Sequence, residues 1–253
     1  VILTHTHIDH IGMLPRLVKE GFKGAVVCTP PTKDLAELML LDAAHLQEED
    51  ADFLNHKGLS KHKPALPLFD SGDARRALAL FTARPYGEWT ELSDRISFRF
   101  LNAGHLLGSA MVEMKVAGNG SFTSLLFSGD LGRYDMPLNP DPEPPPPVDY
   151  MLLESTYGDR LHRTENLYDQ VERVVKETIR RRGIVVVPAF AVGRAQQIIY
   201  VLNVLMEDGR LPELPIHLDS PMAVDATRIY RSYPADHEAR GELQARNVVL
   251  HRT

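Results

Sequence analysis

Three histidines and one aspartate stand within six consecutive residues near the start of the chain, namely His5, His7, Asp9 and His10. The apolar residues 1–3 read as the end of a buried strand, and apolar residues at helical spacing follow from Ile11 to Val18. In an extended chain residues i and i+2 point the same way, so the first three polar side chains can converge, while His10 can approach from the first helical turn. Neutral imidazoles with one carboxylate suit zinc first, and manganese or iron second. The pattern therefore predicts a metal-binding loop; a polar turn with solvated histidines is the competing interpretation.

Two further candidate ligands follow predicted strands later in the chain. Residues Ile96–Phe100 alternate between apolar and polar types, as in a half-buried strand, and lead to His105. Small residues near His105 allow its backbone to approach a neighbour closely. Asp130 follows the predicted strand 121–127 and stands beside glycines. Because both residues come at strand ends downstream of the histidine loop, we expect a third imidazole ligand and a bridging carboxylate, rather than a core histidine and a turn aspartate.

Composition limits the class of protein. The chain has 253 residues, a formal net charge of -6 and a single cysteine, Cys28. The negative charge argues against a protein that coats nucleic acid, but not against a nucleic-acid enzyme whose bound metals offset charge locally. One cysteine fits a reducing cytoplasm, and its apolar neighbours predict a buried structural thiol. No apolar run approaches roughly 20 residues, so no transmembrane helix is expected. The chain opens in mid-strand without an initiator methionine, so we expect it to be an internal part of a longer protein.

The spacing of apolar residues predicts further elements. A helix is expected from about Lys33 to Gln47 with Thr32 as its cap, followed by a polar linker over residues 48–63. A fully apolar strand is expected at Ile184–Val187. Strands and helices alternate from there onward, which indicates a second, α/β layer with a parallel sheet.

Six motifs stand in order along the chain: HTHIDH, NAGHLLGSA, FSGDLGR, LLESTYGD, PAFAVGRAQQ and LDSPMA. The first resembles the metal-binding loop of the metallo-β-lactamase superfamily, and the series resembles its β-CASP group of metal-dependent nucleases. The resemblance covers essentially the whole chain. It implies an α/β protein in which residues 1–159 form part of a metallo-β-lactamase αββα sandwich, with N-terminal strands missing. Residues 160–253 would then form the first part of an α/β β-CASP cap domain.

The resemblance also implies a site with two Zn²⁺ ions. It assigns the first ion to three imidazoles, those of His5, His7 and His105. It assigns the second ion to Asp9 and His10, with Asp130 bridging the two. A hydroxide shared by the metals would attack phosphorus in line, and Asp9 would accept a hydrogen bond from it.

Three residues outside the metal ligands complete the implied site. Glu154 matches the carboxylate that partners the family's general acid, and the resemblance places that acid and the last metal ligand beyond Thr253. Arg194 and Ser220 stand at predicted helix N-termini, whose N–H groups can bind phosphate. The alternative for these two is a surface arginine and a helix-capping serine.

The implied function is zinc-dependent hydrolysis of phosphodiester bonds in single-stranded RNA, by an endonuclease and/or 5′–3′ exonuclease of RNA processing in the cytoplasm. PAFAVGRAQQ and LDSPMA are similar to the RNA-processing branch, which favours RNA over DNA. The alternatives are a β-CASP nuclease that acts on DNA, a non-catalytic scaffold paralogue in an RNA-processing complex, and a small-molecule hydrolase. The presence of all six predicted ligands disfavours the scaffold. We also consider a homodimer and expect no membrane partner.

Overall fold

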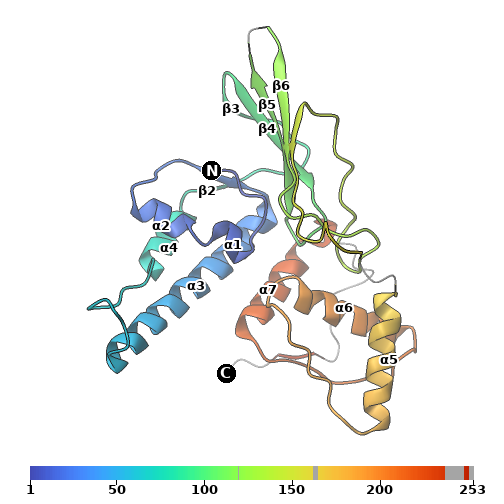
Figure 1. Cartoon of the computed structure of the whole chain (residues 1–253). Coiled ribbons are helices and arrows are strands. Elements are labelled where there is room, and N and C mark those ends of the chain that lie inside the picture. The colour runs from blue at the N-terminus through green and yellow to red at the C-terminus, as the bar shows by residue number, and fades with distance from the viewer. Residues whose placement is uncertain (119, 162–164, 237–247, 251–253) are drawn as a thin grey trace. The chain divides into compact units, whose positions relative to one another are not determined.

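The computed structural model describes residues 1–118, 120–161, 165–236 and 248–250, the last range through its backbone only. The chain divides into two compact units, whose elements are labelled in Figure 1. Unit 1 comprises Val1–Leu131 and Pro142–Leu153, and unit 2 comprises Gly132–Asp141 and Glu154–Thr253.

Unit 1 combines helices with two sheets. Its helices are α1 (Ile8–Ile11), α2 (Leu14–Lys19), α3 (Pro30–Lys57) and α4 (Ser71–Leu78). A parallel two-stranded sheet contains β1 (Val26–Cys28) and β2 (Phe81–Ala83). A five-stranded sheet contains, in spatial order, β3 (Thr90–Ser93), β4 (Ile96–Asn102), β5 (Ala110–Ala117), β6 (Phe122–Phe127) and β7 (Tyr150–Leu152). The pairs from β3 to β6 are antiparallel, and β7 runs parallel to β6.

The alternation of side chains along β1 shows how the layers of unit 1 stack. Val26 and Cys28 pack in a cluster with Leu40 of α3, whereas Val27 packs in a different cluster with Phe98 of β4. Since successive residues of a strand point to opposite faces, the two-stranded sheet lies between the helices and the five-stranded sheet. A helical layer and two sheet layers are therefore present in unit 1. The predicted α/β class is confirmed, and these layers agree with the predicted partial αββα sandwich.

Helix α3 is longer at both ends than the sequence predicted. It begins at Pro30, and its cap is Thr29, whose side chain accepts a hydrogen bond from the Thr32 backbone N–H. Proline fits the first turn because its missing N–H would have no intrahelical partner there. The helix continues through the segment predicted as a linker and ends at Gly58, whose φ of 64° is left-handed. The predicted cap at Thr32 and the predicted linker from residue 48 were therefore wrong.

Cys28 is the buried thiol that its sequence context predicted. It is fully buried, and this burial raises the pKa of the thiol to about 12. Because the thiolate is the nucleophile, we expect iodoacetamide at pH 8 to label the native protein roughly 10³-fold more slowly than an ordinary cysteine. Mass spectrometry of native and urea-unfolded protein measures the difference. Rapid labelling of the native state would contradict the burial of Cys28.

Unit 2 is built mainly from helices. Its elements are α5 (Leu167–Arg180), α6 (Arg194–Glu207), α7 (Pro221–Ser232), the short helix η1 (Pro234–Asp236), and the parallel strands β8 (Ile216–Leu218) and β9 (Val248–Leu250). Val175 of α5 packs with Val201 and Leu205 of α6. The predicted strand at Ile184–Val187 was wrong, because this segment pairs with no strand in the described part of the chain. A strand needs a neighbour for its N–H and C=O groups.

None of the described helices combines the length and the apolar character that crossing a bilayer requires.

Candidate metal centre

Four of the predicted ligands converge in unit 1. The side chains of His5, His7, His105 and Asp130 each offer one ligand atom, and these atoms all lie within 4.8 Å of one another. His5 and His7 precede α1, His105 lies in the loop between β4 and β5, and Asp130 follows β6. His7 Nδ1 lies 3.2 Å from His5 Nε2 and 3.2 Å from His105 Nε2. Three separate segments therefore bring three ring nitrogens and a carboxylate to one point.

The two oxygens of Asp130 face different imidazoles. Its Oδ2 lies 3.6 Å from His5 Nε2 and 3.6 Å from His105 Nε2. Its Oδ1 lies 3.3 Å from His10 Nε2, and His10 Nε2 in turn lies 3.5 Å from Asp9 Oδ2. Asp130 thus stands between two groups of side chains, which is the arrangement that a bridging carboxylate requires.

Asp9 lies apart from the four converging residues. The alternation of side chains along an extended chain predicts that Asp9 points the same way as His5 and His7. The extended segment ends earlier, because α1 begins at Ile8 and takes Asp9 into its first turn. The side chain of Asp9 is 74% exposed, and its Oδ2 lies 3.5 Å from His10 Nε2.

The donor set fits a tetrahedral metal ion. Zinc–nitrogen bonds of about 2.0–2.1 Å at tetrahedral angles place ligand atoms about 3.3 Å apart. The two 3.2 Å separations around His7 Nδ1 match this value. A neutral imidazole has one N–H, so His7 Nδ1 can donate to only one of its two neighbours, whereas a cation accepts all three lone pairs. The Thr4 hydroxyl lies 3.2 Å from His5 Nδ1 and can fix the ring orientation that presents Nε2.

Burial keeps the imidazoles of His5 and His7 neutral. His5 is fully buried, and burial, together with the nearby His10, His7 and His105, lowers the pKa of its ring to about 2. Burial also lowers the pKa of His7, partly opposed by the carboxylates of Asp9 and Asp130. Since only neutral imidazole binds a metal, both rings are in the ligand form at neutral pH.

Comparison with known families decides the identity of the fold. The profile of the metallo-beta-lactamase superfamily matches residues 1–163. The chain belongs to the metallo-β-lactamase superfamily. The profile of the Beta-Casp domain matches residues 195–251, which places the chain in the β-CASP group of this superfamily. The motif resemblance in the sequence is therefore confirmed.

Known proteins of this group are similar over most of the chain. Ribonuclease TTHA0252 of Thermus thermophilus is 40% identical over 232 residues, which are 91% of this chain and 48% of that protein. Transcription termination factor FttA of Methanosarcina mazei is 37% identical over 239 residues, 92% of this chain and 35% of that protein. An RNase J-like protein of Methanocaldococcus jannaschii is 31% identical over 240 residues, 92% of this chain and 50% of that protein. The chain spans half or less of the length of these relatives.

The remaining predicted site residues of this β-CASP chain lie in unit 2. Glu154 directly follows unit 1 in the sequence, and its Oε2 accepts a hydrogen bond of 2.9 Å from the Thr156 N–H. Arg194 is the first residue of α6 and its guanidinium donates to Gln197 Oε1 at 2.8 Å. Ser220 caps α7, and its hydroxyl accepts the Ala223 N–H at 3.2 Å. Both Arg194 and Ser220 therefore have structural contacts, in addition to the phosphate contacts that the sequence suggested.

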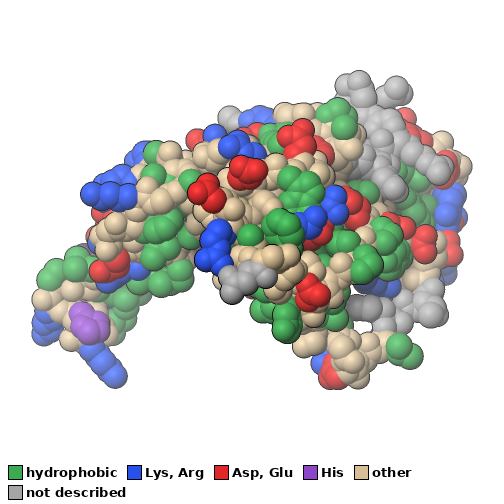
Figure 2. Space-filling view, turned by 90° about the horizontal axis from the view of Figure 1, so that it is seen from above, with side chains coloured by type: hydrophobic (Ala, Val, Ile, Leu, Met, Phe, Trp, Pro, Cys, Tyr) green, Lys and Arg blue, Asp and Glu red, His purple; other side chains and the backbone are tan. Residues whose placement is uncertain are grey.

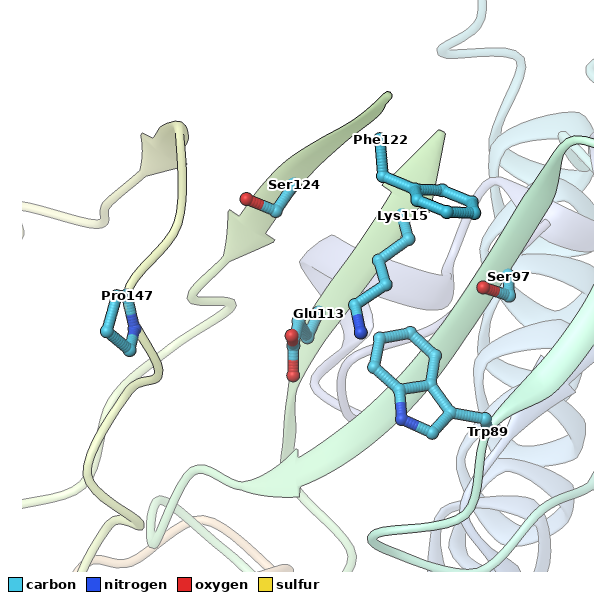
Figure 3. A pocket seen from close by; sticks show the side chains of 7 residues that line it. All are labelled: Trp89, Ser97, Glu113, Lys115, Phe122, Ser124 and Pro147. Carbon is cyan, nitrogen blue, oxygen red and sulfur yellow. The ribbon is translucent and has the colours of Figure 1, made fainter. Parts of the chain in front are cut away.

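A cavity of about 600 Å³ lies elsewhere in the metallo-β-lactamase portion, on the face of the five-stranded sheet that carries Ser97 rather than Phe98 (Figure 3). Two cations contact the ring of Trp89 in this cavity. Lys115 Nζ lies 4.2 Å from the ring centroid, and Arg99 Cζ lies 5.1 Å from it. Arg99 Nε also lies 2.6 Å from Glu113 Oε2. The charged side chains of this cavity thus contact an aromatic ring or a carboxylate, and its lining contains no histidine. This cavity is therefore not the metal centre.

The neutral state of His5 predicts how the stability of the metal-free metallo-β-lactamase portion depends on pH. The unfolded chain binds a proton at His5 below about pH 6.5, whereas the folded chain does so only near pH 2. The free energy of unfolding therefore decreases as the pH falls below 6.5, and His5 contributes up to about 1.4 kcal/mol per pH unit to this decrease. Urea unfolding of chelator-treated protein between pH 7.5 and 5.0 measures the slope. His5→Gln should flatten the slope, and His45→Gln, which alters an exposed ring, should not; equal slopes in all three proteins would contradict this account.

Proposed function

We propose that this chain is part of a zinc-dependent ribonuclease that hydrolyses phosphodiester bonds in single-stranded RNA. The observation that carries the proposal is the convergence of three imidazoles on Asp130 in a chain of the β-CASP group. Relatives named ribonuclease, RNase J-like protein and transcription termination factor support RNA as the substrate. Loss of metal ligands would be expected in a scaffold paralogue, and all six predicted ligands are present.

We assign the ligands to two Zn²⁺ ions that share Asp130. His5, His7 and His105 would hold the first ion, since their ring nitrogens lie at the spacing of tetrahedral ligands. Asp9 and His10 would hold the second, because His10 faces the other oxygen of Asp130. The chemistry that such ions supply when bound is activation of water near neutral pH and neutralisation of charge at phosphorus.

The protein groups around the ions have separate tasks in this proposal. The exposed carboxylate of Asp9 can accept a hydrogen bond from the attacking water and orient it. Glu154 would orient the general acid that protonates the leaving oxygen, and is therefore a positioning residue. Asp130 would hold both ions, because its two oxygens face different imidazoles.

We propose local groups at two helix ends as contacts for RNA. On the face drawn in Figure 2, Lys and Arg side chains are interspersed with Asp and Glu side chains. The N-termini of α6 and α7 carry the partial positive charge of the helix dipole, which favours phosphate, and Arg194 and Ser220 stand at these ends. We propose these two residues as phosphate contacts in addition to their contacts within the protein.

The sequence suggested three further features, which belong to the same proposal. The first is a domain boundary near residue 159. The second is a location in the cytoplasm, which fits the single buried cysteine, Cys28. The third is a homodimer. Sedimentation velocity of the purified protein tests the homodimer.

Cleavage of end-labelled substrates tests the proposed function. The purified full-length protein should cleave single-stranded RNA, lose this activity after chelation, and regain it with zinc. DNA of the same sequence and a small ester or lactam should be cleaved far more slowly. Preference for DNA would support the DNA-acting alternative, and activity on the small molecule alone would support the small-molecule hydrolase. Metal-loaded protein that cleaves none of them would overturn the proposal.

A further inference from the structure

The loop that carries His105 has no regular secondary structure. This His105 loop (residues 103–109) joins β4 to β5, and its Gly104 and Gly108 adopt left-handed φ values of 64° and 83°. In such a segment the position of the imidazole depends on individual hydrogen bonds rather than on a helix or sheet ladder.

Two buried threonines at the start of α3 hold the far end of this loop. Thr29 Oγ1 donates to the Gly108 carbonyl at 2.7 Å, and Thr32 Oγ1 donates to the same oxygen at 2.8 Å. A carbonyl oxygen has two lone pairs and can accept both protons. Both threonines are fully buried, so water cannot replace either hydroxyl. We call Thr29 and Thr32 the threonine pair.

The fit between the loop and α3 is close. A Cβ on Gly108 would lie 2.6 Å from the Thr32 nitrogen, 2.7 Å from Thr32 Oγ1 and 3.0 Å from Pro31 Cβ. Only glycine can bring its carbonyl to the threonine pair at this distance and with this φ. The backbone at Gly108 is therefore fixed against the helix by sterics as well as by hydrogen bonds.

Ser109, which follows Gly108, connects this fixed backbone to His105 through hydrogen bonds. Ser109 Oγ accepts the backbone N–H of His105 at 3.0 Å and that of Leu106 at 3.1 Å. Ser109 is fully buried, and its own carbonyl accepts the Tyr86 hydroxyl at 2.9 Å. A continuous series of contacts thus runs from α3 through Gly108 and Ser109 to the backbone of His105, whose Nε2 lies 3.2 Å from His7 Nδ1.

We infer that Thr29 and Thr32 are positioning residues for the metal centre, because their hydroxyls fix the loop that presents His105. This inference rests on the proposed function, in which His105 is a metal ligand. Groups that orient a ligand without touching the metal commonly contribute roughly 10–100-fold to metal affinity. The threonine pair acts through the backbone of the loop rather than through the His105 ring.

The test compares cobalt binding by Thr32→Val and Thr32→Ser in the full-length protein. Valine keeps the shape of threonine and removes the hydroxyl, so affinity for Co²⁺ should fall roughly 10–100-fold and the visible absorption spectrum of the bound ion should change. Serine keeps the hydroxyl and should restore both. Thr227→Val is the matched control, because Thr227 is also buried and donates to the Ala223 carbonyl at 2.7 Å, but lies in unit 2.

The outcomes separate the inference from the proposed function. If Thr32→Val binds cobalt with wild-type affinity and spectrum, or if Thr32→Ser is as impaired as Thr32→Val, the threonine pair has no positioning role. If the wild-type protein binds no cobalt, the proposed metal centre itself fails, and the inference fails with it. Should Thr32→Val not fold, Thr29→Val removes the other hydroxyl and is measured with the same controls.

Discussion

Replacing Asp130 with alanine is expected to abolish RNA cleavage and to remove most of the bound zinc. The two oxygens of this carboxylate face different groups of imidazoles, at 3.6 Å from His5 Nε2 and 3.3 Å from His10 Nε2. Its removal therefore damages both proposed metal sites together. We expect cleavage to fall by roughly 10³-fold or more, because water activation and charge neutralisation are both lost.

Two other carboxylates serve as comparisons for Asp130→Ala. Glu154→Ala should lose activity and keep its zinc, since Glu154 is assigned a positioning role and no metal contact. Asp149→Asn should keep both its activity and its zinc. Asp149 lies in the same unit as Asp130, but it accepts hydrogen bonds from the backbone and the side chain of Ser124. Zinc content is measured by mass spectrometry of the purified proteins. Equal zinc in Asp130→Ala and Glu154→Ala would contradict the bridging assignment.

Replacing Gly129 with alanine is expected to damage the centre without changing any ligand. A Cβ on Gly129 would lie 2.7 Å from Thr4 Cβ and 2.9 Å from Thr4 Cγ2. Gly129 precedes Asp130 and Thr4 precedes His5, so the clash pushes apart two segments that carry ligands. Left-handed strain and overpacking together should cost about 2–5 kcal/mol of stability. We also expect zinc affinity to fall at least roughly tenfold, as for other groups that orient ligands.

Gly58→Ala is the matched control for Gly129→Ala. The φ of Gly58 is 64° and that of Gly129 is 56°, but a Cβ on Gly58 would meet nothing within 4 Å. Gly58→Ala should therefore cost only about 1–2 kcal/mol from backbone strain and leave zinc binding unchanged. Urea unfolding and zinc titration measure the two effects. If both variants bind zinc equally well, the close approach of Gly129 to Thr4 does not matter for the centre.

The convergence of His5, His7, His105 and Asp130 could be predicted from sequence, because each of them stands at the end of a predicted element. His5 and His7 are two residues apart in an extended segment, so the alternation rule placed them together. His105 and Asp130 follow strands, and the ends of β4 and β6 bring them to the same point. The rule failed at Asp9, because the chain had already turned into α1 at Ile8.

Features that depend on contacts between distant segments could not be predicted. The local sequence around Thr29 and Thr32 indicates only helix capping. Their proposed positioning role depends on hydrogen bonds to Gly108, which lies far away in the sequence. Ile184–Val187 has the composition of a strand, but pairing requires a neighbour that composition does not supply. The length of α3 was not predicted because residues 48–57 are mostly polar, and helices with a largely exposed face give little apolar periodicity.

Anomalous X-ray scattering at the zinc edge, from crystals of the full-length protein, locates the proposed ions. Two peaks are expected, one on either side of the Asp130 carboxylate. One should lie among His5 Nε2, His7 Nδ1 and His105 Nε2, and the other beside Asp9 and His10. Zinc-loaded crystals with no peak among the three ring nitrogens, or with peaks only at other sites, would contradict the proposed metal centre.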